Sequence, residues 1–318
     1  MEQLLKEFPT ELRFVYRHYP LIGTPESPFH DKAALSTQAA EAAGKQGKFW
    51  EMHDLLFNQQ SDWSTLTVSD FQQWLIQKAG ELDLDVEKFT TDLTSDELVT
   101  QAQAAWDNTK KIGLISTPTL LVNERAWPSN VAMSAFNLAA VIRLTMLEDS
   151  QFTECPPMTV DPTKQYVATL HTEKGDIVIE LYADRAPITV NSFIFLARHG
   201  WFDGVTFHRV IPGFVAQAGD PSGTGYGTPG YAYKNEISPD LLFDGPGVVG
   251  MANAGADSIG SQFFITYAAQ PTLDGSFTIF GHVIEGMDVA SSLTPRNPTE
   301  NADLPPGDEI LSVTIDEK

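Results

Sequence analysis

The chain has 318 residues, of which 42% are hydrophobic and 19% charged, a composition typical of globular proteins that bury a core. This length is about twice that of a typical domain, so we expect two domains. The formal charge of −22, from 20 Lys and Arg residues against 42 Asp and Glu residues, predicts a surface that repels phosphate backbones and anionic lipid headgroups, so nucleic acid is excluded as an expected partner.

The N-terminus and the cysteine content exclude further classes. The first residues, MEQLLKEFPTEL, are acidic where an export signal would be basic, and no apolar run reaches membrane-spanning length, so membrane insertion is not expected. The chain as given is therefore expected to be cytoplasmic by default. Cys155 is the only cysteine, which excludes an internal disulfide, a Cys-X-X-Cys motif and a thiolate metal cluster. The seven histidines lack metal-ligand spacing, so no metal site is expected.

The first half of the chain has a mainly helical pattern, preceded by one strand predicted at residues 12–17, where Leu12, Phe14 and Tyr16 alternate with other side chains. A short strand is predicted at residues 120–122, before a turn at Asn123-Glu124. Helices are predicted where apolar periodicity runs between Gly, Ser, Asp and Thr residues, at 32–43, 49–58, 68–79, 86–93, 97–112 and 131–147.

Residues 148–163, EDSQFTECPPMTVDPT, contain three prolines and no apolar periodicity, which predicts an extended linker. We therefore expect domains at 1–147 and 164–318. The second domain is rich in glycine and short strands, which predicts an all-β barrel. Its one clear helix is predicted at 187–199, and its strands at 166–172, 176–181, 204–210, 214–217, 247–251, 263–266, 278–284 and 310–315.

Four ordered motifs mark this second domain. Residues 207–220 read FHRVIPGFVAQAGD, and MANAG at 251–255, SQFFI at 261–265 and LDGSFTIFG at 273–281 follow. Together they resemble the cyclophilin family of peptidyl-prolyl cis-trans isomerases over about residues 166–315. The resemblance implies a closed eight-stranded barrel capped by two helices, and an enzyme that rotates X-Pro bonds in peptides and unfolded proteins without a cofactor.

Rotation about an X-Pro bond breaks no covalent bond, so it needs neither a nucleophile nor a metal. Its barrier is about 18–20 kcal/mol because the half-twisted amide loses its resonance. An enzyme lowers this barrier by binding the twisted amide better than either planar form. The prolyl nitrogen of the twisted amide can accept a hydrogen bond, which a rigid, permanently charged guanidinium can donate.

The resemblance assigns these roles to particular residues. Arg209 matches the catalytic arginine, Phe214 an aromatic wall of the proline pocket and Gln217 the residue that orients the arginine. His208 is expected to be structural, because rotation needs no general base. The substrate-binding positions that the resemblance implies are Val215, Ala252, Asn253, Gln262, Phe264, Thr272, Leu273 and Phe277.

Three of these positions depart from the family pattern: Val215, Thr272 and Phe277 stand where methionine, tryptophan and histidine are usual. We expect catalysis to survive these changes. The resemblance associates tight cyclosporin binding with the tryptophan, so weak cyclosporin binding is expected here. The alternative function is a non-catalytic module that binds proline peptides or acts as a chaperone. Residues 223–230, GTGYGTPG, loosely match a dinucleotide fingerprint but are better interpreted as a loop lining the substrate groove.

Residues 12–21, 46–54 and 113–119 (LRFVYRHYPL, QGKFWEMHD and GLISTPT) resemble the DsbA-type, thioredoxin-like family over about residues 2–147. The resemblance implies a helix-rich α/β domain with a cis Thr117-Pro118 bond. The Cys-X-X-Cys of that family is absent, so we expect no redox activity. Two explanations remain: a degenerate scaffold that binds unfolded clients, or, as the favoured one, an internal Met1 in a longer, exported protein.

Overall fold

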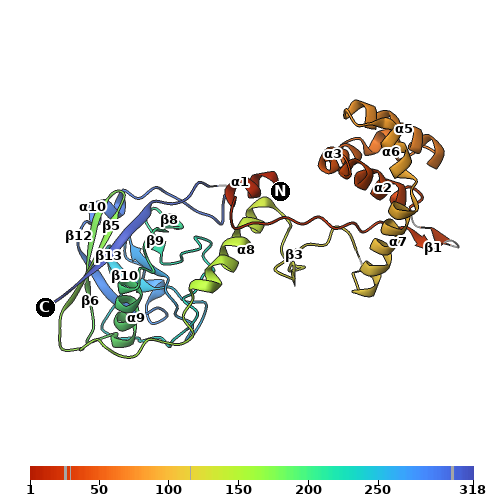
Figure 1. Cartoon of the computed structure of the whole chain (residues 1–318). Helices are drawn as coiled ribbons and strands as arrows, with labels where there is room; N and C mark the ends of the chain where they lie inside the picture. The colour runs from red at the N-terminus through yellow and green to blue at the C-terminus, as the bar shows by residue number, and fades with distance from the viewer. Residues whose placement is uncertain (25–26, 29, 115, 302–303) are drawn as a thin grey trace. The chain divides into compact units, whose positions relative to one another are not determined.

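The computed structural model describes residues 1–24, 27–28, 30–114, 116–301 and 304–318. The chain divides into two compact units, Arg13–Ser129 and Met1–Leu12 with Asn130–Lys318 (Figure 1). The second unit includes helices α1 (Glu2–Glu7) and α8 (Ala135–Leu147), which pack on each other through Leu4, Phe8, Ala139 and Ile142. The domain limits expected at residues 147 and 163 stay a prediction.

The unit Arg13–Ser129 is built from helices around one apolar core. All the helices predicted in this stretch form, each within two residues of its predicted start. Thr67, Asp85 and Ser95 each cap a helix by accepting a hydrogen bond from a main-chain N–H of its first turn. The helices are α2 (Ala33–Gly44), α3 (Phe49–Asn58), α4 (Gln60–Trp63), α5 (Val68–Glu81), α6 (Val86–Leu93) and α7 (Asp96–Lys111).

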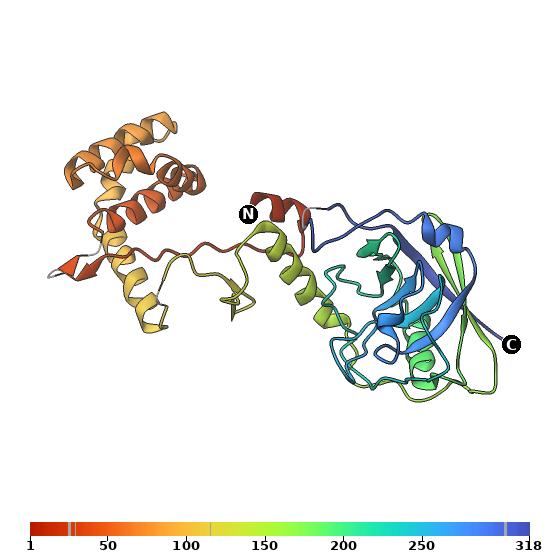
Figure 2. The same ribbon diagram turned by 180° about the vertical axis from the view of Figure 1, so that it is seen from behind.

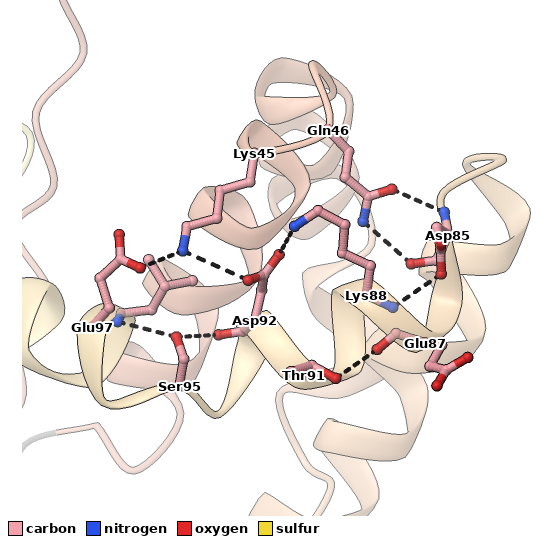
Figure 3. Close-up of polar contacts among 10 residues, drawn as sticks. Lys45, Gln46, Asp85, Glu87, Lys88, Thr91, Asp92, Ser95 and Glu97 are labelled. Atoms are coloured by element: carbon pink, nitrogen blue, oxygen red, sulfur yellow. Dashed lines mark hydrogen bonds and ion pairs between the residues drawn. The ribbon is translucent and has the colours of Figure 1, made fainter.

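Polar contacts hold the end of α2 against α6 and α7 (Figure 3). Lys45 Nζ lies 2.7 Å from Glu97 Oε2 and 3.6 Å from Asp92 Oδ1. The Gln46 amide accepts a hydrogen bond from the main-chain N–H of Asp85 and donates one to its carbonyl. Lys45, Asp85 and Glu97 are exposed, so these polar contacts add little stability, and the buried apolar side chains supply most of it.

The strand predicted at residues 12–17 does not form, and this prediction was wrong. The predicted alternation is present, since Phe14 and Tyr16 pack on Trp50 and His53 of α3 while Val15 is exposed. A strand also needs a hydrogen-bonded neighbour, and no strand pairs with this segment in the part of the chain that the structure describes. The alternation of side chains along residues 12–17 therefore accompanies an extended chain that is not part of a sheet.

Two short hairpins belong to the same unit: β1 (Gly23–Thr24) with β2 (Ser27–Pro28), and β3 (Leu121–Val122) with β4 (Arg125–Ala126). The predicted turn at Asn123-Glu124 is confirmed, and both residues have positive φ angles, 46° and 67°. The Thr117-Pro118 bond is cis, as the resemblance implied. Ile115 of the quoted 113–119 motif lies outside the described residues.

The unit that contains residues 130–318 is dominated by one curled antiparallel sheet (Figure 1). Its closure into an eight-stranded barrel stays a prediction. Its strands, in spatial order, are β7 (Val205–Thr206), β13 (Glu309–Glu317), β5 (Tyr166–Thr172), β6 (Gly175–Leu181), β12 (Ile279–Glu285), β10 (Val248–Met251), β11 (Phe263–Thr266), β9 (Val215–Ala218) and β8 (Arg209–Ile211).

Helix α9 (Pro187–Arg198) lies against this sheet and contacts β13 (Figure 2). A second, shorter helix, α10 (Met287–Ser291), follows β12. The single strand predicted at residues 204–210 is divided into β7 and β8, and the two parts pair with different neighbours, β7 with β13 and β8 with β9. None of the helices among the described residues is long and apolar enough to span a membrane.

The segment predicted as a linker begins with the short 3-10 turn η1 (Glu148–Ser150) and continues without regular secondary structure. Helix α8 begins at Ala135, later than predicted, because the Ser134 hydroxyl accepts from the Asn137 N–H and so caps the helix there.

His208 is 4% exposed beside β8, as its structural role predicts. Its Nδ1 has no hydrogen-bond partner among the described residues. Burial lowers the pKa of His208 to about 4, although the Asp220 carboxylate opposes this shift, while Arg296 and Arg209 support it. The folded protein therefore keeps this imidazole neutral at neutral pH.

A pH dependence of stability follows. Above about pH 6.5 the imidazole is neutral in both the folded and the unfolded state. Between about pH 6.5 and 4 only the unfolded chain binds the proton, which favours unfolding. The free energy of unfolding should therefore decrease as the pH falls through this range, by on the order of 3 kcal/mol in total. Denaturant unfolding of wild type and His208→Gln at pH 7.5 and 4.5 measures this difference.

The exposed Met158→Ala variant changes no ionisable group, so it is the control and should retain the wild-type pH dependence. Equal pH dependence of wild type and His208→Gln would show that His208 is not the group responsible.

Candidate active site

Three predicted site residues lie in one row across neighbouring strands. Arg209 on β8 is directly opposite Gln217 on β9, and Gln217 is directly opposite Phe264 on β11. Residues that are paired in this way project from the same face of a sheet, while their neighbours along each strand project from the other face. We call the face that carries this row the site face.

The opposite face of these strands is core. Val210, Ala216 and Ile265 are neighbours of the row residues, and all three are at most 2% exposed within the main apolar cluster of this unit. The core therefore fixes which residues reach the site face, because a shift of one residue in register would bury Arg209 and expose Val210.

The Arg209 guanidinium is held at a defined place on the site face. Its Nη1 donates to Gln217 Oε1 at 3.3 Å, and its Cζ lies 5.3 Å from the centre of the Phe214 ring. Partial burial lowers the pKa of Arg209 below its ordinary value, yet a guanidinium remains charged at neutral pH. The site thus presents a fixed cation next to an aromatic ring.

A chain of side-chain amides continues from this arginine. Gln217 Nε2 donates to Gln262 Oε1 at 3.0 Å, and Gln262 Nε2 donates to the carbonyls of Gly225 and Gly227 at 3.0 and 3.2 Å. Because Arg209 can only donate, the oxygen of Gln217 must face it, and this fixes the orientation of both amides. Gln262 therefore connects the site face to the glycine-rich loop.

Apolar side chains form the rest of the site face. The Phe264 ring contacts the rings of Phe277 and Phe243 at centroid distances of 5.7 and 5.5 Å. Gly250 is opposite Phe264 on β10, and a Cβ atom there would lie 2.7 Å from the Phe264 ring. The cluster consists of buried Val215, Phe243, Val248, Phe264 and Ile279, with partly buried Tyr182, Phe214, Leu241, Ala252, Leu273 and Phe277.

Asn253 and Thr272 lie at the margin of this cluster. Asn253 Nδ2 donates to the Ser276 carbonyl at 3.0 Å, and its Oδ1 accepts from the Gly255 N–H at 3.2 Å. Thr272 is exposed on the 3-10 turn η2 (Pro271–Leu273), next to Leu273. Sequence reasoning missed Phe243 and Gly250 because they act only as backing for the Phe264 ring, which no local motif indicates.

Two regions of this chain are similar to known protein families. Residues 167–315 match the family model for cyclophilin type peptidyl-prolyl cis-trans isomerases, and residues 2–139 match a thioredoxin family model. The Mycobacterium tuberculosis protein named peptidyl-prolyl cis-trans isomerase A is 41% identical over 180 residues, which cover 51% of this chain and 98% of that protein.

Two further similar proteins follow. The Mus musculus peptidyl-prolyl cis-trans isomerase-like 1 is 47% identical over 139 residues, 43% of this chain and 82% of that protein. A solved cyclophilin type isomerase of Cryptosporidium parvum is 32% identical, with a TM-score of 0.45, over 49% of this chain and 99% of that one.

Family models thus confirm the resemblance to the cyclophilins and the thioredoxin-like character of the first region, while its DsbA type stays a prediction. The mycobacterial and mouse relatives are matched over most of their own length and are named as isomerases. The chain belongs to the cyclophilin-type peptidyl-prolyl cis-trans isomerases, with a thioredoxin-like region preceding the isomerase domain.

Proposed function

We propose that this protein catalyses rotation about X-Pro bonds in peptides and unfolded proteins. The observation that supports this most directly is the row Arg209, Gln217 and Phe264 on the site face, with Phe214 beneath the guanidinium. This row places one fixed hydrogen-bond donor with a positive charge at the edge of an apolar surface. A proline ring fits such a surface, and its nitrogen would lie next to the cation.

Catalysis follows from differential binding. A planar amide nitrogen is a poor acceptor, whereas the pyramidal nitrogen of the twisted amide can accept from Arg209, so this hydrogen bond strengthens only in the transition state. The Gln217 amide holds the guanidinium in place, so little reorganisation is required during rotation. The apolar cluster excludes water and thereby strengthens the interaction.

The remaining site residues receive binding roles in this proposal. Phe264, Val215, Leu273 and Phe277 would surround the proline ring, in keeping with their place in one apolar cluster. The substrate residue that precedes the proline would be bound by Gln262 and by the segment at Ala252 and Asn253. The side chain of Asn253 accepts from Gly255 of its own loop and donates to the Ser276 carbonyl of another loop, so it would act mainly by fixing that segment.

The thioredoxin-like region is proposed to act without redox chemistry, because the chain has one cysteine, Cys155, and it lies outside that region. A dithiol enzyme needs two neighbouring thiols. Unfolded polypeptides as clients and closure of the sheet into an eight-stranded barrel are part of the same proposal.

Replacing Arg209 by alanine tests the catalytic assignment. Without the guanidinium the twisted amide loses its charged donor, and kcat/KM should fall about a hundredfold. Exchange between the cis and trans forms of a proline tetrapeptide, followed by NMR or by a coupled protease assay, measures this change. Arg198→Ala, on the exposed end of α9, is the control and should match wild type.

Unchanged exchange rates in Arg209→Ala would exclude the proposed mechanism. If the variant and wild type both bound the peptide and neither accelerated exchange, the protein would be a non-catalytic binding module.

Exposed Thr272 generates a prediction about cyclosporin. Cyclosporin should inhibit the wild-type protein only weakly, and Thr272→Trp should strengthen its inhibition by about tenfold, because an indole N–H adds one hydrogen-bond donor. Thr272→Phe supplies a ring without this donor and should gain less. Inhibition curves for the three proteins in the exchange assay measure the effect, and nanomolar inhibition of wild type would contradict it.

A further inference from the structure

The segment between α8 and β5 is bound to the isomerase domain along most of its length. Residues 151–160 of this segment, which we call the strap, follow α8 in yellow-green in Figure 1. They precede residue 167, where the match to the isomerase family model begins. The strap therefore lies outside the stretch that the family model matches.

The C-terminal end of the strap is fixed by a buried side chain of α9. Asn191 is 2% exposed, and its Oδ1 accepts from the N–H groups of Thr159 and Val160 at 2.8 and 3.2 Å. Its Nδ2 donates to the Pro157 carbonyl at 3.1 Å. Without the strap, this amide would be buried with unsatisfied hydrogen-bonding groups, which is costly.

The N-terminal end of the strap is fixed by aromatic packing. The centre of the Phe152 ring lies 4.9 Å from that of Phe195, 5.8 Å from that of His199, 6.0 Å from that of Trp201 and 6.4 Å from that of Tyr231. Phe152 thus joins α9 to residues from two other segments. Aromatic contacts of this kind stabilise the fold through the apolar area that they bury and through the favourable orientation of the rings.

The strap also runs along residues 228–232, which include the end of the glycine-rich stretch 223–230. The Phe152 N–H donates to the Pro229 carbonyl at 2.8 Å, and Gln151 Nε2 donates to the Thr228 carbonyl at 3.0 Å. A Cβ atom on Gly230 would lie 2.2 Å from the Phe152 carbonyl oxygen, so only glycine permits this approach. The strap and this part of the loop are complementary in shape.

The same loop carries the two carbonyls that hold Gln262. On its other side, Asp220 is fully buried and accepts from the N–H groups of Gly225 and Gly227 at 2.7 and 3.0 Å. The loop is thus fixed by a carboxylate from within and by the strap from outside. A continuous series of contacts leads from Phe152 through the loop to Gln262 and on to the arginine of the site face.

We propose that Gln151 and Phe152 are positioning residues of the isomerase, which fix the glycine-rich loop so that Gln262, Gln217 and Arg209 are preorganised. This inference rests on the proposed function. The strap acts only through the loop and touches no substrate. Removing either side chain should therefore loosen the loop carbonyls and lower catalytic efficiency, although neither residue lies in the stretch that the family model matches.

The test uses the full chain with Phe152→Ala, Gln151→Ala and the control Met158→Ala, a strap residue that is 53% exposed. We expect kcat/KM to fall about fivefold in the first two variants, with the loss mainly in kcat, and to remain at the wild-type value in the control. Phe152→Leu retains an apolar side chain and should recover part of the activity. The side-chain amide NMR signals of Gln262 and Gln217 should shift in the two strap variants and not in Met158→Ala.

A double-mutant cycle tests the route. If the strap acts through Gln262, Phe152→Ala should have little further effect in a Gln262→Ala background. Independent, multiplying losses would overturn the proposed route. Wild-type kcat/KM in both Phe152→Ala and Gln151→Ala, together with a large loss in Arg209→Ala, would overturn this inference alone. No loss in Arg209→Ala would instead refute the proposed function. Gln151→Ala removes only a surface hydrogen bond, so it provides a folded variant if Phe152→Ala unfolds.

Discussion

The register between β8, β9 and β11 is the constraint on which the site depends. Side chains alternate between the faces of a strand, so the burial of Val210, Ala216 and Ile265 forces Arg209, Gln217 and Phe264 onto the opposite face. The free energy that fixes this arrangement comes from apolar burial on the core side, while the chemistry takes place on the other side. The packing of the core therefore determines the position of the Arg209 guanidinium.

Buried polar side chains fix the irregular segments around the site, which the strand register does not position. Asp220 and Asn191 are almost inaccessible to solvent, and each accepts hydrogen bonds from main-chain N–H groups of irregular chain. Irregular segments have no ladder to satisfy their main chain, so side chains must do so. Asp220 holds the glycine-rich loop in this way, and Asn191 holds the strap that packs against it. The loop in turn supplies the carbonyl acceptors for Gln262.

Local sequence was most informative where hydrogen bonding is local. Every predicted helix of the region before the strap formed, with ends set by caps such as Thr67 and Ser134. It was least informative where a partner is required. Residues 12–17 have the alternation of a strand and remain unpaired in the described part of the chain, while the strand predicted at 204–210 is divided into two strands that pair with different neighbours.

By itself, the sequence determined the family, the single cysteine, the substitutions at Val215, Thr272 and Phe277, and the identity of the residues expected around the proline ring, because these are properties of residue type and order. The tertiary structure decided three further points: that Phe243 and Gly250 support the Phe264 ring, that Gln262 turns its amide toward the loop, and that the proline-rich segment is bound rather than free. Each depends on atoms far apart in the chain, and only folding brings those atoms together.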